Sequence, residues 1–142
     1  MDQYVHYGAT TVDIYDTALD LQLRRATLIF IEELRDIETT LIELARANQD
    51  AIMPGRTLGQ HALPITFGNK VSTWIGENWR DIERLKSLVG EVDRSAILKG
   101  AVGTYAGLGN RAIDIGQSFA KELGLSQPYP DDWHGSRDDF AS

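Results

Sequence analysis

The chain has 142 residues, of which 42% are hydrophobic and 25% charged, a balance that predicts one ordinary soluble globular domain. Its 21 acidic residues outnumber the 14 basic ones, so the formal charge is −7 and nucleic acid is not expected as a partner. The absence of cysteine excludes disulfides and thiolate metal sites, and the absence of an apolar run of roughly 20 residues and of a leader-like N-terminus predicts no membrane contact and a cytoplasmic location.

The first predicted element is one long helix from about residue 12 to about residue 48. This stretch contains neither proline nor glycine, and apolar residues such as Leu19, Phe30 and Leu41 recur at three- and four-residue steps. At about 1.5 Å per residue such a helix spans roughly 55 Å. Further apolar residues widen the stripe beyond one face, so we expect other helices to cover it and the chain to form a homo-oligomer.

The next stretch, Ala51 to Leu63, breaks the helical period with prolines and glycines and is predicted to be a structured loop. A second helix is expected to follow, with Pro64 in its first turn and an apolar stripe that continues to about Val89. Gly68 and Gly76 inside this helix each cost about 1 kcal/mol relative to alanine. That cost favours a close approach of a neighbouring helix at both glycines.

The last part of the chain is predicted to be less regular. Lys99 to Gly109 contains four glycines, which indicate a turn or a broken helix. A third helix is expected from about Arg111 to Leu123, with Gly124 in a C-cap position, and the tail 125–142 is expected to be extended. No strand pair or internal repeat is visible, so the predicted fold class is all-α, a bundle of long helices.

Three separated segments resemble the conserved blocks of one enzyme family, in the same order. Residues 5–26, VHYGATTVDIYDTALDLQLRRA, resemble a His-x-Gly-x-Thr-Ser turn that leads into a long helix with Asp-Thr-Ala. Residues 53–85, MPGRTLGQHALPITFGNKVSTWIGENWRDIERL, resemble a Gly-Arg-Thr-His-Gln-type block followed by Pro, Thr-Phe-Gly and Lys. Residues 99–110, KGAVGTYAGLGN, with WHGSRDDFA after them, resemble a Gly-Ala-Val-Gly-Thr segment and an Arg-Asp stretch.

These are the blocks of the fumarase/aspartase superfamily, and the match is closest to its adenylosuccinate lyase and 3-carboxy-cis,cis-muconate cycloisomerase branch. The resemblance covers nearly the whole chain and implies a partial lyase domain over residues 1–142, taken from the central helical domain of such an enzyme. It also implies homo-oligomers, since the family builds tetramers around a shared helical bundle. The family's Ser-Ser-x-Met-Pro-x-Lys-x-Asn-Pro loop, which carries the catalytic base, has no match in this sequence.

The family reaction is an anti β-elimination, in which a base removes a proton next to a carboxylate and an acid protonates the leaving group. The resemblance therefore implies a lyase or cycloisomerase that acts on a small-molecule dicarboxylate without a cofactor. Hydroxyls, exposed loop N–H groups and a guanidinium group suit a dicarboxylate. His6 is the catalytic candidate. The substrate-binding candidates are Thr10, Thr11, Arg56, Thr57, Gln60, Lys70, Thr104 and Arg137.

Several candidates also have a purely structural interpretation. Thr11 fits the N-cap of the long helix, Arg56 and Arg137 fit surface ion pairs, and Lys70 fits a solvated helix lysine. The sequence assigns no single role to two further histidines. His61 is as well suited to orient the turn before Pro64 as to act in a site, and His134 resembles the Trp-His of the cycloisomerase branch. The three histidines lack ligand spacing, so no metal site is expected.

Leu58 leaves the activity open. Adenylosuccinate lyases have the histidine of Arg-Thr-His at this position, and leucine transfers no proton, whereas cycloisomerases commonly have a non-histidine residue there. Leu58 therefore favours the cycloisomerase branch or a divergent lyase. The alternative function is a catalytically silent helical oligomerisation module derived from this family, favoured by Leu58 and the unmatched base loop. An unrelated partner-binding bundle explains the apolar faces but not three ordered motifs.

Overall fold

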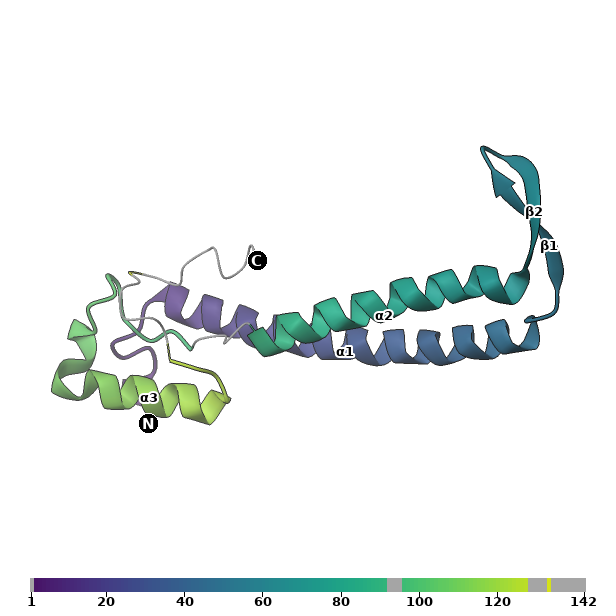
Figure 1. Cartoon of the computed structure of the whole chain (residues 1–142). Coiled ribbons are helices and arrows are strands. Elements are labelled where there is room, and N and C mark those ends of the chain that lie inside the picture. Colours follow the sequence, from purple (N-terminus) through teal and green to yellow (C-terminus); the bar gives the residue numbers. More distant parts are fainter. Residues whose placement is uncertain (1, 92–95, 128–132, 134–142) are drawn as a thin grey trace. The chain divides into compact units, whose positions relative to one another are not determined.

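The computed structural model describes residues 2–91, 96–127 and 133 (Figure 1). In chain order the elements are η1 (Asp2–Tyr4), α1 (Thr11–Ala47), β1 (Ile52–Thr57), β2 (Gln60–Thr66), α2 (Phe67–Glu91), η2 (Ala106–Arg111) and α3 (Ala112–Leu123). Helices dominate, and the strands form one two-stranded sheet, so the predicted all-α class is confirmed. Within these residues, none of the helices combines the length and the apolar character that crossing a membrane requires.

The chain divides into two compact units. Unit 1 contains the chain up to Ala26 and from Gly90 onward, and unit 2 runs from Thr27 to Val89. Helix α1 therefore supplies its first part to unit 1 and its longer second part to unit 2.

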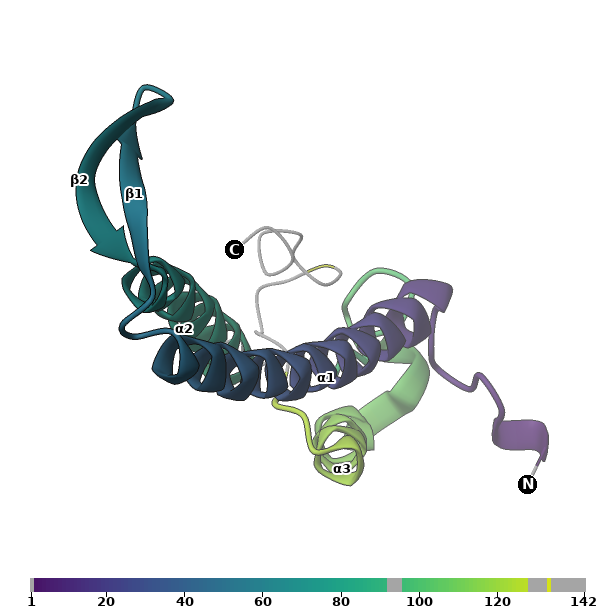
Figure 2. The same ribbon diagram turned by 90° about the vertical axis from the view of Figure 1, so that its right-hand side faces the viewer.

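Unit 2 is a pair of long helices joined by a hairpin. Residues 27–47 of α1 lie side by side with α2, and the β1–β2 hairpin connects them at one end (Figures 1 and 2). The predicted first helix is confirmed, since its bounds are Thr11–Ala47. Between the helices, Val71 and Ile82 are fully buried. The buried side-chain amide of Asn78 adds a specific contact, because its Nδ2 donates to the carbonyl oxygen of Leu34 at 3.0 Å.

The two glycines of α2 have different surroundings. A Cβ atom added at Gly68 would lie 2.6 Å from the carbonyl oxygen of Ala45 near the end of α1, so the close approach predicted there is confirmed. A Cβ atom added at Gly76 would lie 3.4 Å from one guanidinium nitrogen of Arg80 and near no atom of another element within the described chain. Arg80 belongs to α2 itself. Within the described chain no second helix approaches Gly76, so a close approach there stays a prediction for a helix of another subunit.

The stretch Ala51 to Leu63, predicted to be a loop, lies mostly in an antiparallel hairpin instead. Pro64, predicted in the first turn of the second helix, lies in β2 opposite Pro54, and α2 begins at Phe67. Prolines are tolerated because each strand of a two-stranded ribbon has a free edge, where a missing N–H removes no ladder bond. The hairpin is mostly exposed on both faces, so it lacks the hydrophobic alternation that marks a half-buried strand.

Unit 1 combines the start of α1 with irregular backbone and three short helical elements, η1, η2 and α3. The predicted break is confirmed, because η2 is interrupted at Gly109, where φ is 66° and ψ is −154°. Helix α3 ends at Leu123, and Gly124 adopts the left-handed conformation of a C-cap, as predicted. Most of the tail 125–142 lies outside the described residues. The buried apolar residues of this unit are Ala96, Ile97, Ala112 and Ala120.

Candidate functional site

A fully buried carboxylate joins the first and third motif segments in unit 1. Oδ2 of Asp13 accepts hydrogen bonds from the N–H of Thr10 at 3.0 Å and from the N–H of Gly100 at 2.9 Å. Oδ1 accepts a third bond, from the N–H of Lys99 at 3.3 Å. The bond to Thr10 satisfies a backbone donor at the N-terminus of α1. The other two bonds hold the start of the Gly-Ala-Val-Gly-Thr segment against the helix.

One turn further along α1, a second side chain holds the same segment. The buried hydroxyl of Thr17 accepts from the N–H of Ile97 at 3.0 Å and lies 3.4 Å from the carbonyl oxygen of Ile97, to which it donates. The N–H groups of Ile97, Lys99 and Gly100 therefore find acceptors on helix side chains, and that of Ala96 donates to the carbonyl oxygen of Ser126, as buried backbone requires. Asp16 and Asp20 are also buried. The start of α1 thus has a polar buried face.

Close contacts at glycines place the turn that carries His6 directly against the third segment. A Cβ atom at Gly8 would overlap the side chain of Leu108. A Cβ atom at Gly107 would lie 3.0 Å from Cα of Gly8, and one at Gly100 would lie 3.1 Å from the carbonyl oxygen of Gly8. Gly8 also has a φ of 70°, which other residues rarely adopt. Glycine at this position therefore allows both the turn and the contact.

The Gly-Ala-Val-Gly-Thr segment forms a closed loop. The N–H of Tyr105 donates to the carbonyl oxygen of Lys99 at 2.9 Å, which brings the two ends of the loop together. The indole N–H of Trp133 donates to the carbonyl oxygen of Ala101 within the loop at 3.4 Å. Thr104 is exposed at the end of this loop. Unit 1 thus gathers His6, Thr10 and Thr104 on two segments that contact each other.

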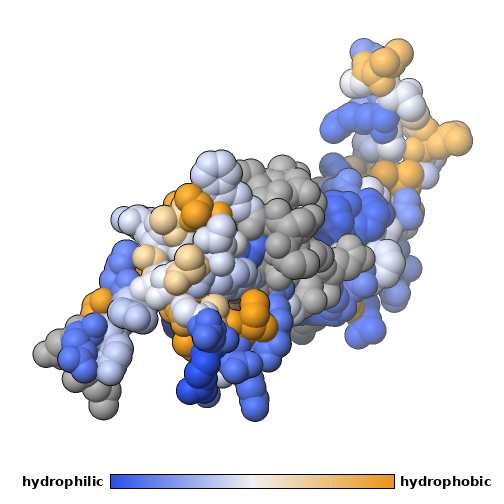
Figure 3. Space-filling model, turned by 90° about the vertical axis from the view of Figure 1, so that its left-hand side faces the viewer, coloured by the Kyte–Doolittle hydropathy of each residue, from blue (hydrophilic) through white to orange (hydrophobic). Residues whose placement is uncertain are grey.

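The hairpin of unit 2 carries a second group of candidates, all of them exposed. Arg56 pairs with His61 across the strands, and Thr57 pairs with Gln60. Directly opposite residues share a face of a ribbon, and successive residues alternate between faces. The hairpin therefore places Arg56 with His61 on one face and Thr57 with Gln60 on the other. Apolar side chains of the hairpin are also exposed, at the upper right of Figure 3.

The remaining candidates are less informative. The Nζ atom of Lys70 lies 5.9 Å from the ring centroid of Trp74 on the same helix, a contact that fits a solvated helix lysine. His6 and Thr11 are exposed in unit 1. Arg137 and His134 lie outside the described residues. In the part of the chain that the structure describes, no three histidine, aspartate or glutamate residues are grouped so that they could hold a metal ion.

Backbone strain coincides with the three motif segments. Among the described residues, the non-glycine residues with positive φ are His6 at 63°, Leu58 at 49° and Tyr105 at 61°. Each belongs to a different motif, and such conformations cost of order 1–3 kcal/mol. Leu58 and Gly59, whose φ is 76°, form the two-residue turn of the hairpin, where positive φ at both positions matches a type I′ turn. The Leu58 side chain there is 102% exposed.

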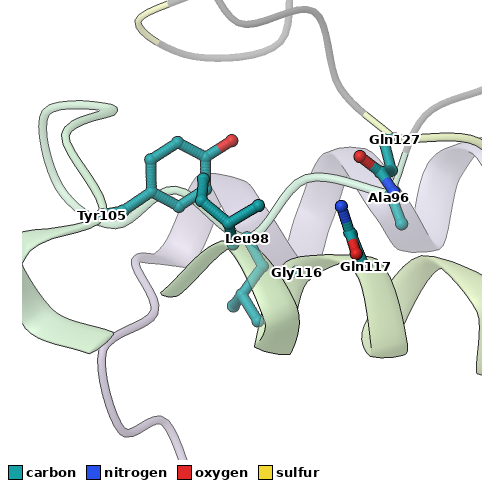
Figure 4. A pocket seen from close by; sticks show the side chains of 7 residues that line it. Ala96, Leu98, Tyr105, Gly116, Gln117 and Gln127 are labelled. Atoms are coloured by element: carbon teal, nitrogen blue, oxygen red, sulfur yellow. The ribbon is translucent and has the colours of Figure 1, made fainter. Parts of the chain in front are cut away.

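Tyr105 lies beside two hollows of unit 1. The smaller has a volume of about 30 Å³, room for roughly one water molecule, and Figure 4 shows Tyr105 and Leu98 at one end and the amides of Gln117 and Gln127 at the other. A second, open hollow of about 400 Å³ falls in the size range of small-molecule sites. Its lining residues are Thr104, Tyr105, Ala106, Gly109, Asn110, Ala112 and Ile113.

Burial, and then the negative charge of Asp13, raise the pKa of the Tyr105 phenol. The phenol is therefore a neutral hydrogen-bond donor at physiological pH. Sequence reasoning did not select either residue. Asp13 had a usable signal, since an acidic residue three positions after Thr10 resembles a capping box. Tyr105 had no such signal, because its surroundings depend on burial and on a left-handed backbone.

Comparisons with known proteins find lyases that are similar to nearly the whole chain. The sequence profile of a family described as "Lyase" matches residues 1–140. N-acetyl-S-(2-succino)cysteine lyase of Dickeya dadantii is 40% identical over 144 residues, which cover 98% of this chain and 30% of that protein. Adenylosuccinate lyase of Pyrococcus abyssi is 42% identical over 125 residues, which cover 87% of this chain and 27% of that protein.

A solved structure of a related enzyme is similar to the chain in both fold and sequence. The β-carboxy-cis,cis-muconate cycloisomerase of Acinetobacter calcoaceticus sp. ADP1 superposes with a TM-score of 0.87 at 39% sequence identity. The match covers 96% of this chain and 31% of that one. The chain therefore spans less than a third of the length of the relatives it matches.

Proposed function

Because the chain belongs to the fumarase/aspartase superfamily, we propose that it supplies substrate-binding segments to a lyase-type enzyme. That enzyme acts on a dicarboxylate by anti β-elimination or cycloisomerisation, in the manner of adenylosuccinate lyase or carboxymuconate cycloisomerase. The observation that carries this proposal is the coincidence of motif and strain at His6, Leu58 and Tyr105. Strained non-glycine residues cluster at functional sites, where the surrounding structure holds them in place.

The segments of unit 1 suit an anion. Thr10 and Thr11 stand at the N-terminus of a 37-residue helix, whose positive dipole end favours negative charge. His6 is exposed in the turn before this helix, where an imidazole can donate to a carboxylate or take part in proton transfer. Thr104 adds a hydroxyl from the neighbouring loop, at the edge of the open hollow. We assign anion binding to the threonines and a catalytic role to His6.

The hairpin of unit 2 supplies the strongest charged donor. The guanidinium of Arg56 can hold a carboxylate with two parallel hydrogen bonds. His61 lies directly across from Arg56, so both cationic or polar groups face the same side of the ribbon. Thr57 and Gln60 face the other side, and we assign them to a different part of the substrate. Lys70 and Arg137 complete the proposed substrate-binding set.

Titration of the chain with fumarate, a small dicarboxylate, tests this proposal. We expect Arg56→Ala to weaken fumarate binding by roughly fivefold, the effect of losing an exposed charge pair of about 1 kcal/mol. Arg84→Ala is the matched control, because Arg84 is an exposed arginine of α2 in the same unit and forms an ion pair with Asp81. Equal fumarate affinity in both variants, or no binding by the unsubstituted chain, would contradict the assignment.

The alternative is a catalytically silent helical oligomerisation module. Leu58 favours it, because leucine at the tip of the hairpin transfers no proton. Exposed apolar residues on both long helices also favour it, among them Phe30 and Trp79. The two functions differ in ligand binding. A silent module assembles but does not bind fumarate, and Arg56→Ala then changes neither property.

A further inference from the structure

Asp13 is the residue that physically connects the two proposed binding segments of unit 1, although it belongs to neither. We propose that Asp13 is a positioning residue, which holds the His6–Thr11 turn and the 100–104 loop in one fixed arrangement for binding an anionic substrate. The identity of the ligand rests on the function proposed above. The positioning itself rests on the contacts of the Asp13 carboxylate.

The chemistry of this contact requires a carboxylate. Three backbone N–H groups converge on the two oxygens of Asp13, and they come from positions 3, 86 and 87 residues away along the chain. An ionised carboxylate is an acceptor only and offers about four lone-pair sites. An asparagine of the same shape has one acceptor oxygen, which at the Oδ2 position still accepts from Thr10 and Gly100, while its amide nitrogen faces the N–H of Lys99. Asp13→Asn therefore loses the charge and one of the three hydrogen bonds, and Asp13→Ala removes all three.

The connected segments contact each other beyond Asp13. Gly8 lies against Gly100 and Gly107, where an added carbon would force the backbone of Gly8 to shift. Because the backbones touch, a shift of the turn displaces the loop as well. Thr10, bonded directly to Asp13, and Thr104, at the end of the loop, are thereby set in one arrangement before a ligand arrives. Donors fixed in advance lose less freedom on binding.

Asp13 could instead serve only to stabilise the fold. Substitution of Thr17 distinguishes this purely structural role from a positioning role. Thr17 is buried on the same part of α1 and bonds the same irregular segment through Ile97. Among the described residues, the hydrogen bonds of its hydroxyl join Ile97 and not the turn before the helix. If Asp13 only stabilises the fold, loss of the Thr17 hydroxyl should have the same consequences. If Asp13 positions the turn, fumarate binding should respond to Asp13 and not to Thr17.

The test is fumarate titration of the 142-residue chain by two-dimensional NMR, with Asp13→Ala, the milder variant Asp13→Asn and the isosteric control Thr17→Val. We expect the amide signals of residues 6–11 and 100–104 of the parent chain to shift along one saturation curve. We expect Asp13→Ala to weaken fumarate binding at least tenfold and to separate the responses of the two segments, and Asp13→Asn to have a smaller effect. Thr17→Val should keep the parent affinity within about twofold, even where it lowers the melting temperature as much.

A spectroscopic signature in the absence of ligand accompanies this test. Since the charge of Asp13 contributes to the raised pKa of Tyr105, Asp13→Asn should move the Tyr105 titration to lower pH, and Thr17→Val should not. Equal fumarate affinity in the parent chain and in folded Asp13→Ala would overturn the inference and leave the proposed function standing. No fumarate binding by the parent chain would instead overturn the proposed function.

If Asp13→Ala does not fold, Gly8→Ala provides the same test. Its added carbon would lie 2.4 Å from Cδ2 of Leu108 and 3.1 Å from the carbonyl oxygen of Gly107, and a φ of 70° is strained for alanine, so the turn must shift against the loop while the Asp13 carboxylate is kept. We expect Gly8→Ala to weaken fumarate binding and to separate the two NMR responses. Parent-like affinity in this folded variant would show that the joint arrangement is not needed, and would overturn the inference.

Discussion

Leu58 is placed unfavourably in both its backbone and its side chain. Its φ of 49° in a type I′ turn suits asparagine, and its apolar side chain is fully exposed. We expect Leu58→Asn to raise the free energy of unfolding by about 1 kcal/mol, the lower end of the cost of such strain. Urea unfolding followed by circular dichroism measures this change. Leu63→Asn, an exposed leucine of β2 with ordinary φ, should give a smaller gain; an equal gain would mean that strain is not the cause.

Tyr105 should make the stability of the chain depend on alkaline pH. Its pKa is raised above the ordinary value of 10.0, first by burial and then by Asp13. Between these two pKa values the unfolded chain loses a proton that the folded chain keeps, so stability falls as pH rises. The contribution of Tyr105 is therefore complete below about pH 10 and is lost as pH rises through the folded pKa.

Thermal melts from pH 8 to 11 check this dependence. We expect the melting temperature of Tyr105→Phe to fall less steeply above pH 10 than that of the parent chain. Tyr15→Phe, which removes an exposed phenol of α1, is the matched control and should follow the parent. Parallel curves for all three proteins would show that Tyr105 has no such role.

At the scale of residues, sequence motifs located the binding candidates but not the groups that hold them. Thr10 and Thr104 could be named because their motifs are local in sequence. Asp13 acts across 87 residues, and a contact of that range leaves no periodic signal in a single sequence. Tyr105 depends on a backbone angle that its neighbours impose. The grouping of Arg56 with His61 required the register of the hairpin.

The two glycines of α2 give a matched test at the scale of elements. Gly68→Ala would place Cβ 2.6 Å from a backbone oxygen of α1, so the helices must separate, and we expect a loss of about 1–3 kcal/mol in the free energy of unfolding. Gly76→Ala meets one flexible arginine side chain and should gain about 1 kcal/mol from helix propensity. Denaturant unfolding of both variants measures these two changes in the free energy of unfolding. The same sign for both would contradict the difference in packing.

The helices were predictable because their signals are local and repeated. A stretch without proline or glycine and with a sustained 3.6-residue period gave α1 to within one residue at each end. Gly124 marked the end of α3 in the same way. The hairpin was missed because it contains Pro54 and Pro64, and proline normally argues against a strand. The two prolines are paired across the ribbon, and each strand has a free edge that tolerates a missing N–H. Its exposure on both faces removed the alternation that would have competed with those prolines.

At the scale of the whole molecule, exposed apolar side chains predict self-association. They lie along the part of α1 in unit 2 and on α2, and they include Leu28, Ile29, Phe30, Ile37, Leu44, Trp74 and Trp79. So many large apolar side chains exposed on two helices are unusual for a monomer. We expect sedimentation velocity to show oligomers whose proportion rises with concentration.

A pair of substitutions identifies the surface. Phe30, which is 61% exposed, should be needed for assembly, so Phe30→Glu should shift the chain towards monomer. Thr39→Glu introduces the same charge at an exposed polar position of the same helix and should not. A stable monomer at high concentration that binds no apolar dye would refute the prediction.

The 142-residue chain alone is expected to turn over neither adenylosuccinate nor 3-carboxy-cis,cis-muconate. It spans less than a third of the relatives it matches, and Leu58 transfers no proton. A missing proton-transfer group typically costs roughly 10²–10⁴-fold in rate. Spectrophotometric assay of the purified chain with each substrate tests this. Robust turnover would require a second proton-transfer group besides His6, among residues that have no such role here.

The most direct test of dicarboxylate binding by the motif segments is the position of the amide NMR signals that fumarate shifts in the unsubstituted chain. We predict saturable shifts at residues 6–11, 56–60, 70 and 100–104, and none along the exposed surfaces of α2 beyond Lys70 or of α3. Saturable shifts confined to those helix surfaces, or no shift at fumarate concentrations up to tens of millimolar, would contradict the assignment of these segments to substrate binding.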